Sequence, residues 1–318
     1  MAGLLNPGRT AVINRAIDST IREDYSGAIL LMDSLIRAEP DRPEGWFFRA
    51  AIQSIRMTDE ESFRHEAAFL ADLDSAETRA LQLEPVSHDT PDVAFCLASI
   101  TSYRAYHASR REEWLKAVSL GLGAVRSFER VQELWPDFPD VRLGLGNYLF
   151  WKSVKMRAFQ WMPFIEDERR EGIRLVESAR RSGEYHSWVA ASNLSWMYLE
   201  DKQPQQALEI CEEGLAHYPG SRLFLFPLGD ALIQLQQWSR AEEVWRTILA
   251  QLESPTQNSG VNRVICHEKL ARIAEARGDH ARALDLARTG LGILVDKAQK
   301  SRVRDTRRRL QELLDSNN

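Results

Sequence analysis

Residues that could carry catalytic or metal chemistry occur in the sequence, but their spacing fits none of the usual arrangements for it. His267-Glu268 lacks the second histidine of a zinc-binding HExxH helix. Gly121-Leu122-Gly123 and Gly144-Leu145-Gly146 follow no predicted strand and precede no Lys-Ser/Thr pair, which argues against phosphate-binding loops. No GxSxG nucleophile motif is present. We therefore expect no catalytic residue, no metal ligand and no cofactor.

The bulk composition limits the class of function further. The chain has 318 residues and a formal net charge of -5, so it shows no basic excess for a nucleic-acid backbone. Its cysteines, Cys96, Cys211 and Cys266, lie far apart and form no CxxC pair or disulfide framework. No apolar run reaches the roughly 18 residues of a membrane span, and the segment before Asn6 is too short for a signal-peptide core. We expect a cytoplasmic protein, or a periplasmic one if a leader has been removed, without nucleic acid as a partner.

Binding of a peptide or protein is a different kind of chemistry, and it depends on the elements that present the side chains. Apolar residues recur at spacings of three and four, as in Ala28, Leu31, Met32 and Leu35. Alternation bounded by Asn-Gly or Asp-Gly turns, the pattern of strands, is nearly absent. Pro and Gly fall mostly between the helical segments. The sequence therefore predicts an all-α fold.

A fixed spacing of twelve residues separates a small or apolar residue within a helix from the proline that ends this helix. A small residue lets the neighbouring helix approach closely, and proline stops the helix and turns the chain. Because the chain has only twelve prolines, four of them at one spacing indicate a repeat. The pairs are Ala28 and Pro40, Leu73 and Pro85, Ala124 and Pro136, and Ala207 and Pro219.

The first helix of each pair carries the other half of a known pattern, W-x2-L-G-x2-Y. Leu194-Ser195 with Tyr198, Leu228-Gly229 and Leu145-Gly146 match its central positions. With these motifs and the proline spacing, the chain resembles the tetratricopeptide repeat family over about residues 9–295. The resemblance implies an α-solenoid of about seven helical hairpins in a right-handed superhelix. Over about forty residues, from Gly144 to Gly172, the chain is also similar to the eukaryotic tetratricopeptide-39 family.

Three central hairpins, between about residues 43 and 184, are longer than the 34-residue repeat. In the end hairpins the small residues of the two helices are twelve apart, as are Ala16 and Ala28. The central hairpins therefore carry 11, 13 and 14 extra residues, which we expect to lengthen both helices. The central pairs, 23, 25 and 26 residues apart, are Ala50 and Leu73, Ser99 and Ala124, and Gly146 and Gly172.

Aromatic side chains gather in and near the tips of these long hairpins. One interpretation is a second core that holds the hairpins together, and the other is an exposed surface that docks a partner. Trp161-Met162-Pro163-Phe164 is the best candidate for exposure, because Pro163 forces an irregular tip. The set comprises Phe63, Phe69, Tyr103, Tyr106, Trp114, Phe150, Trp151, Phe159, Trp161 and Phe164.

The family resemblance also implies which side chains line a concave groove formed by the first helix of each repeat. The central positions hold aromatic residues and two asparagines. An asparagine can donate to and accept from a peptide backbone at once, and aromatic rings supply contact area at low entropic cost. Packing between repeats is the alternative role for each of them. The candidate partner-binding residues of groove and tips are Phe47, Tyr103, Asn147, Trp151, Trp161, Asn193, Trp196, Phe226 and Asp230.

A basic segment, residues 296–318, follows the repeats. Its Leu310, Leu313 and Leu314 can pack against the last hairpin, since solenoids need a terminal helix to cover their final apolar face. We expect this capping role, and a site for an acidic partner or nucleic acid is the alternative. The basic residues are Lys297, Lys300, Arg302, Arg304, Arg307, Arg308 and Arg309.

These patterns favour a non-catalytic scaffold that binds a peptide or protein through the groove, the aromatic tips or both. A second function stays open, namely a receptor for an apolar small molecule or lipid tail in a cavity between the long hairpins. An open groove with Trp196 and Phe226 exposed would favour the scaffold. A deep, closed apolar pocket between the long hairpins would favour the receptor.

Overall fold

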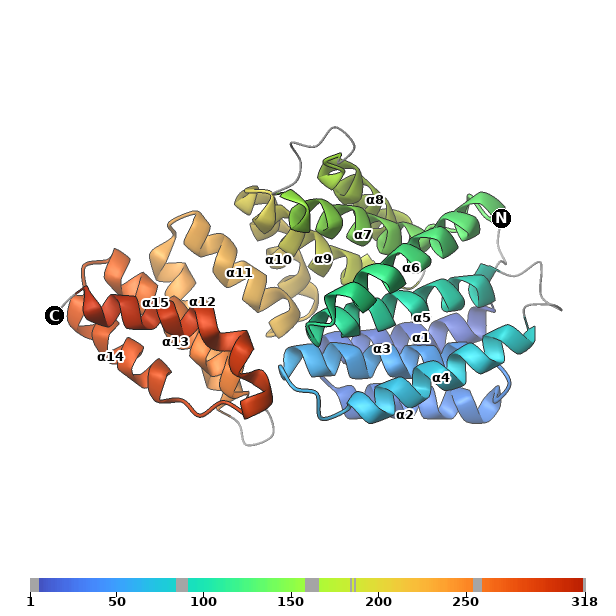
Figure 1. The fold of residues 1–318 in the computed structure, drawn as a ribbon, viewed down its shortest axis with the longest axis horizontal. Helices are drawn as coiled ribbons and strands as arrows, with labels where there is room; N and C mark the ends of the chain where they lie inside the picture. The colour runs from blue at the N-terminus through green and yellow to red at the C-terminus, as the bar shows by residue number, and fades with distance from the viewer. Residues whose placement is uncertain are drawn as a thin grey trace. The chain divides into compact units, whose positions relative to one another are not determined.

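The protein is described by a computed structural model that covers residues 6–83, 91–157, 166–183, 185, 187–253 and 259–316. Every regular element in these ranges is a helix, and consecutive helices pack in antiparallel pairs (Figure 1). None of these helices is both long and apolar enough to cross a membrane. The helices are α1 (Pro7–Ile21), α2 (Tyr25–Ala38), α3 (Glu44–Asp59), α4 (Glu66–Leu83), α5 (Pro91–Arg110), α6 (Trp114–Leu134), α7 (Val141–Lys155), α8 (Arg169–Ser182), α9 (Ser187–Glu200), α10 (Pro204–His217), α11 (Arg222–Gln234), α12 (Trp238–Leu252), α13 (Gly260–Ala276), α14 (His280–Gly292), the 3₁₀ helix η2 (Lys297–Val303) and α15 (Arg304–Asp315).

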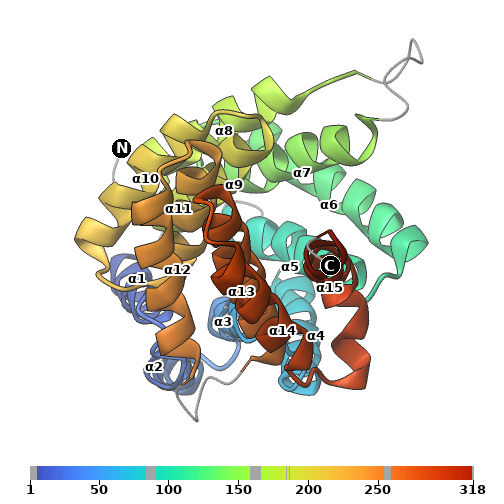
Figure 2. The same ribbon diagram turned by 90° about the vertical axis from the view of Figure 1, so that its left-hand side faces the viewer.

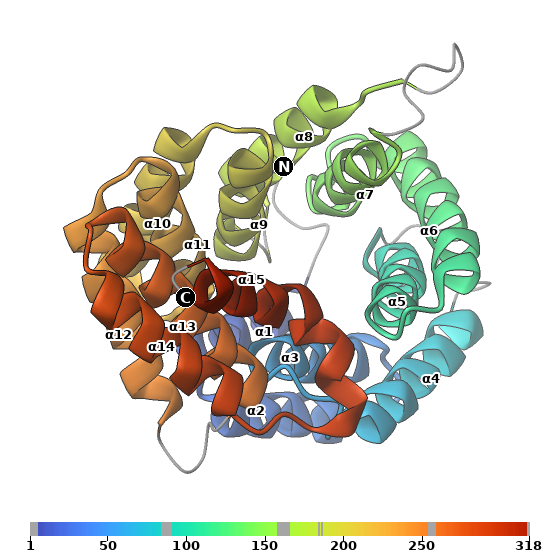
Figure 3. The ribbon, with the colours of Figure 1, turned by 60° about the vertical axis from the view of Figure 1, so that its left-hand side comes forward.

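The chain divides into two compact units. Unit 1 comprises Met1–Arg56 and His65–Met197, and unit 2 comprises Met57–Arg64 and Tyr198–Asn318. The division therefore assigns the end of α3 and the following turn to unit 2, and it falls within α9. In unit 1, α3, α5 and α7 form an inner row of helices, with α4, α6 and α8 outside them (Figure 3). The predicted all-α solenoid of paired helices is confirmed.

The second helices of three hairpins end as their prolines predict, and the fourth predicted proline, Pro85, lies outside the described residues. Glu39, Trp135 and Tyr218 each cap such a helix immediately before a proline. Their φ angles are -134°, -133° and -127°, and their ψ angles are 68°, 74° and 73°. This shared conformation lies outside the α region, as expected for a residue that precedes proline. The repeated backbone geometry shows that the proline spacing marks equivalent points in three hairpins.

In the fourth hairpin the two helices meet at the predicted small residues. There, Gly146 of α7 faces Gly172 of α8. A Cβ atom added to Gly172 would lie 2.7 Å from the carbonyl oxygen of Gly146 and 2.9 Å from the backbone nitrogen of Phe150. Both obstacles are backbone atoms, so the helices can accept a side chain there only by moving apart.

We expect Gly172→Ala to destabilise the protein by about 1–3 kcal/mol, the usual cost of overpacking a tight contact. Urea denaturation followed by circular dichroism measures this loss. Gly292→Ala is the matched control, because an added Cβ at Gly292 meets no atom within 4 Å. Equal midpoints for the two variants would contradict the close contact between α7 and α8.

The extra residues of the long hairpins are distributed unequally between helix and turn. In a regular hairpin, α9 runs five residues past Ser195 and α10 begins three residues before Ala207. In the third hairpin, α5 runs eleven residues past Ser99 and α6 begins ten residues before Ala124, so the whole insertion is helical. The second hairpin gains helix in both arms and three residues in its turn.

The prediction that both helices lengthen is wrong for the fourth hairpin. Its first helix, α7, runs nine residues past Gly146, four more than in the regular hairpin. Its second helix, α8, begins three residues before Gly172, as α10 does before Ala207. The other ten extra residues therefore fall between the two helices. A spacing between small residues measures how long the insertion is but not how it folds.

In unit 2, helices α10 to α14 follow one another side by side (Figure 2). Helix α15 covers the last pair, α13 and α14, which is the predicted capping position. Its Leu310 joins a buried cluster with Val264 and Ala287, and Arg309 Nε donates to Glu268 Oε1 at 2.8 Å. The apolar face of the final hairpin is thereby closed.

His267 of α13 gives unit 2 a predicted pH dependence. Burial, and then the positive charge of Arg263, lower the pKa of this imidazole below its ordinary value of 6.5. Protonation therefore costs more in the folded state than in the unfolded state. The stability that the neutral ring provides is complete above pH 6.5 and is lost as the pH falls through the folded pKa.

We expect His267→Gln to lessen the loss of stability on acidification below pH 6.5, as measured by urea denaturation at several pH values. His280→Gln is the control, because the His280 side chain is largely exposed. An unchanged pH profile for His267→Gln would remove this residue as the cause.

Candidate functional site

The predicted groove residues of unit 1 differ in their access to solvent. Phe47 of α3 is buried, with its ring 5.6 Å from that of Tyr103 and 6.5 Å from that of Phe95. Tyr103 of α5 keeps part of its surface exposed, yet burial, and then the charge of Tyr106, raise its pKa to about 12. In this structure Phe47 serves packing between α3 and α5, and Tyr103 presents a neutral hydroxyl.

The two predicted asparagines make the same kind of hydrogen bond in different helices. Asn147 Nδ2 donates to the carbonyl oxygen of Leu143 at 2.9 Å, and Asn193 Nδ2 donates to that of Val189 at 2.8 Å. Each amide nitrogen thus binds its own helix, which leaves the side-chain oxygen as the group to accept from a ligand. Trp196 of α9 is 38% exposed, and Trp151 packs edge-on against Phe150 at 5.1 Å.

The two remaining groove residues, Phe226 and Asp230, belong to α11 in unit 2. The Phe226 ring lies 5.8 Å from that of Trp245. Asp230 Oδ1 pairs with Lys269 Nζ at 2.5 Å, and this Nζ also lies 5.6 Å from the Trp245 ring. The carboxylate of Asp230 is therefore neutralised within the unit. Trp161, the last of the predicted set, lies outside the described residues.

Two of the cysteines, which could act as nucleophiles, are buried. Burial raises the pKa of Cys96 well above its ordinary value and that of Cys266 to about 12. Both thiols therefore stay protonated at neutral pH and are poor nucleophiles. Within the described ranges of the chain, no three His, Cys, Asp or Glu side chains are placed to share a metal ion.

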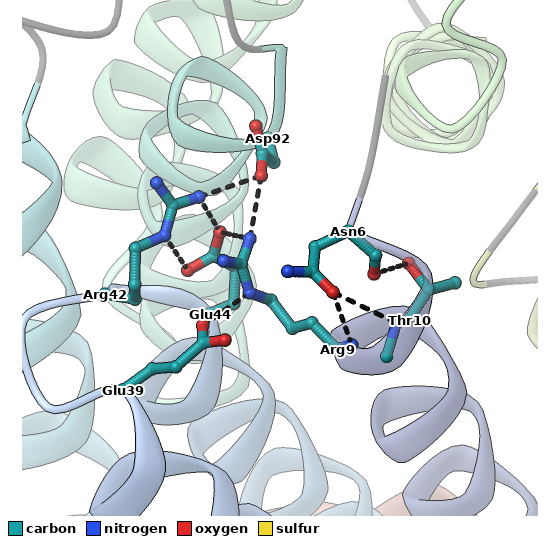
Figure 4. Close-up of polar contacts among 8 residues, drawn as sticks. Asn6, Arg9, Thr10, Glu39, Arg42, Glu44 and Asp92 are labelled. Carbon is teal, nitrogen blue, oxygen red and sulfur yellow. Dashed lines mark hydrogen bonds and ion pairs between the residues drawn. The ribbon is translucent and has the colours of Figure 1, made fainter. Parts of the chain in front are cut away.

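The most concentrated set of charges in unit 1 joins the first three hairpins (Figure 4). Arg9 of α1 contacts Glu39 at 2.7 Å, Glu44 of α3 at 2.8 Å and Asp92 of α5 at 3.1 Å. Arg42 also contacts Glu44, and it pairs with Asp92 at 2.8 Å. Glu44 and Asp92 are buried, and their helix N-terminal positions suit a negative charge. With its carboxylates paired to arginines, this network is suited to holding hairpins together.

Four exposed apolar side chains lie on the outward face at the start of α6, in the third hairpin. Leu115 is 90% exposed, Val118 61%, Leu122 45% and Trp114 53%. The first three recur at spacings of three and four, so they form one stripe along two helical turns. This stripe, together with Trp114, is called the α6 apolar face below. Exposed apolar clusters of this kind usually mark interaction sites.

The α6 apolar face begins on the helical turns that the insertion adds to α6. Helix α6 begins ten residues before Ala124, whereas α4 begins seven before Leu73 and α8 only three before Gly172. The first turns of α6 therefore have no counterpart at the start of α8, the next helix of the outer row. Farther along, the outward face of α6 is charged, with Arg126, Glu129, Arg130 and Glu133 exposed.

Trp114 is one of the predicted tip aromatics, but the other three residues of the α6 apolar face were not predicted from the sequence. The available signal was a second apolar stripe, Leu115, Val118 and Leu122, opposite the core stripe that contains Ala124, Phe128 and Val131. Of the predicted tip aromatics, some belong to a buried core and others are exposed to solvent. Phe69 and Phe150 are buried, whereas Trp114 and Tyr106 are exposed. Phe159, Trp161 and Phe164 lie outside the described residues.

Comparison with known proteins identifies the repeat. Residues 198–256, which include α10 to α12, match the sequence profile of the tetratricopeptide repeat family. No curated protein sequence matches the chain. The chain is similar in fold to a chain in the crystal structure of the APC/C hetero-tetramer Cut9-Hcn1, with a TM-score of 0.59 at 11% identity. That match covers 98% of this chain but only 57% of the other.

Two further solved structures match this chain with TM-scores below 0.5. One is PilW, a widely conserved type IV pilus biogenesis factor, with a TM-score of 0.43 and 14% identity over 98% of this chain and 100% of PilW. The other is the C-terminal part of a TPR repeat-containing protein from Cytophaga hutchinsonii, with a TM-score of 0.45 and 13% identity over 92% of this chain and 98% of that one.

Proposed function

We propose that this chain, an α-solenoid of tetratricopeptide-repeat hairpins, is a non-catalytic scaffold that binds an amphipathic helix of a partner protein on the α6 apolar face. The observation that carries the proposal is the exposure of Leu115, Val118 and Leu122 in one stripe. Burying a fully exposed leucine or valine side chain contributes about 1.5–3 kcal/mol, so a partner that covers this stripe gains a substantial binding energy.

The geometry of the face favours a helix as the bound element. From Leu115 to Leu122 the stripe runs seven residues, or roughly 10 Å along the helix axis. Side chains at spacings of three and four form ridges that pack into the grooves of a second helix. An extended strand would instead need an unpaired sheet edge, and the described part of the chain contains no strand.

The charges around the face favour acidic residues on the partner helix. Lys155 Nζ lies 5.3 Å from the Trp114 ring. Arg126 follows Leu122 on the same outward line of α6. Among the residues that the structure describes, neither cation has a carboxylate partner. We therefore propose a partner helix with a leucine-like stripe and acidic residues beside it.

The groove residues named from the sequence form a second part of the proposal. Trp196 offers an exposed indole, and the side-chain oxygens of Asn147 and Asn193 can accept hydrogen bonds from a peptide backbone. Because Trp196 is exposed and Phe47 is buried, Trp196 is the better candidate of the two for contact with a partner. Its test is Asn193→Ala combined with Trp196→Ala, and an unchanged affinity for the partner would remove the groove from the site.

A photo-crosslinking amino acid at position 115 tests the α6 apolar face directly. The same probe at position 133, on the charged part of the same helix face, is the control. The expected result is a crosslink from position 115 alone, to a segment of another protein with an apolar helical stripe and acidic neighbours. A synthetic peptide of that segment should bind the wild type and lose at least tenfold in affinity to Leu115→Ser/Leu122→Ser.

Two outcomes contradict the proposal. One is equal crosslinking from positions 115 and 133, which indicates non-specific contact. The other is crosslinking to a second copy of the chain, with self-association abolished by Leu115→Ser. Since these side chains are exposed, both serine variants should keep the helical circular dichroism spectrum of the wild type.

A further inference from the structure

A cavity of about 680 Å³ lies within unit 2, apart from the α6 apolar face. Its walls come from three places in the sequence: the turn after α3, the start of α13, and the segment from the end of α14 to η2. This volume is within the roughly 300–1,000 Å³ of small-molecule sites. The polar lining residues are Glu60, Ser62, Arg64, Ser259, Arg263, Arg288, Thr289, Asp296 and Gln299.

Three arginines, one from each part of the wall, contribute positive charge to the cavity. Arg64 follows α3, Arg263 is on the first turn of α13, and Arg288 is on α14. In the described part of the chain, Arg64 and Arg288 form no ion pair. Among the described residues that line the cavity, two are carboxylates, Glu60 and Asp296, so the three arginines leave an excess of positive charge. Burial, and then the charge of Arg263, lower the pKa of the nearby His267.

The helix geometry adds to this positive potential. Helix α13 begins at the cavity with Ser259 as its N-cap and Gly260 as its first residue. The Ser259 hydroxyl already accepts from the N–H of Asn262, and the helix dipole favours an anion near this end of α13. Ser62 and Thr289 add hydroxyl groups to the wall. Guanidinium groups, hydroxyls and a helix N-terminus are the donors that oxyanions select.

We propose that this cavity binds a phosphoryl group, with Arg64, Arg263 and Arg288 as its cationic ligands. A single carboxylate is satisfied by one guanidinium, whereas the three oxygens of a phosphoryl group can use several. The cavity is much larger than a bare phosphate ion, so it has room for the molecule that carries the group. That carrier is either a small metabolite or a phosphorylated side chain of a protein.

Isothermal titration calorimetry with three probes tests the site and its source of phosphate. The probes are inorganic phosphate, adenosine monophosphate, and a phosphoserine peptide beside its unphosphorylated form. The wild type should bind at least one phosphoryl probe, and Arg64→Gln/Arg288→Gln should weaken it by about tenfold or more. Arg15→Gln/Arg37→Gln, which removes two exposed arginines of unit 1, should leave the affinity unchanged.

The His267 imidazole provides a reporter of where the probe binds. A phosphoryl group beside Arg263 offsets the positive charge that this ring experiences, so binding should raise the pKa of His267 in a nuclear magnetic resonance titration. Preference for the phosphopeptide assigns the site to a phosphoprotein, and preference for adenosine monophosphate assigns it to a metabolite. The proposal is overturned if no phosphoryl probe binds, if the double variant binds as the wild type does, or if binding leaves His267 unaffected.

Discussion

Replacing Arg222 with methionine is expected to destabilise unit 2 by about 3–5 kcal/mol, the usual cost of leaving a buried charge without its partner. Arg222, the first residue of α11, has a side chain that is 3% exposed. It binds Asp59 through two parallel contacts, Nε to Oδ1 at 2.9 Å and Nη2 to Oδ2 at 2.5 Å. In the variant, the Asp59 carboxylate stays buried and loses its cation.

Urea denaturation of the variant measures this loss, with Arg240→Met as the matched control. Arg240 pairs with Glu212 at 2.5 Å, but both side chains are about half exposed, so that change should cost less than about 1 kcal/mol. Adding Asp59→Leu to Arg222→Met should recover part of the stability, because the unpaired charge disappears. A loss for Arg222→Met no larger than that for Arg240→Met would show that the pair contributes little.

The second large effect is expected in unit 1, where Arg9→Met should also cost about 3–5 kcal/mol. Arg9 bridges Glu39, Glu44 and Asp92, and without it Arg42 is the one cation among the described residues that still pairs with the buried Glu44 and Asp92. Asp92 Oδ1 already has no hydrogen-bond partner in the described structure. The cost should therefore be larger than for an isolated surface pair such as that of Arg130 and Glu133, which serves as the control.

The pH dependence of the Arg9→Met defect separates charge from packing. Burial raises the pKa of Glu44 above its ordinary value of 4.5, while Arg42 and Arg9 lower it. Removing Arg9 therefore raises this pKa further. A carboxyl group with a raised folded pKa stabilises the fold below its ordinary pKa, and this contribution is lost as the pH rises through the folded value. The defect should thus be smaller near pH 4.5 than at neutral pH, whereas a packing defect would be the same at both.

Much of the fold could be predicted because the contacts within each repeat join residues at fixed, short separations in the sequence. A small residue in each helix marks where the hairpin closes, and Gly146 and Gly172 meet as their assignment in the pattern required. The prolines after Glu39, Trp135 and Tyr218 marked helix ends because a proline disfavours the α conformation of the residue directly before it. Neither prediction needed information about distant residues.

The candidate site was harder to predict because exposure depends on neighbours. Leu115, Val118 and Leu122 have the apolar side chains and the spacing of a core stripe, yet they are exposed in the structure. Phe47, a groove residue by its position in the repeat, is buried because the rings of Phe95 and Tyr103 lie against it. The assignment of Met57–Arg64 to unit 2 rests on pairs such as Asp59 and Arg222, which are 163 residues apart and have no local signature.

The turn after α3 therefore affects when unit 2 can fold during synthesis and where the chain can be truncated. Met57–Arg64 leaves the ribosome long before α10, yet its contacts are to Arg222, Asn262, Gln299 and Arg302. Unit 2 cannot be complete until nearly the whole chain has been synthesised, and closing such long loops slows folding. A fragment that begins at Tyr198 would contain every helix from α10 onward but would lack the partner of Arg222. For unit 2, the smallest piece of sequence that holds all its native contacts begins more than a hundred residues before its first repeat.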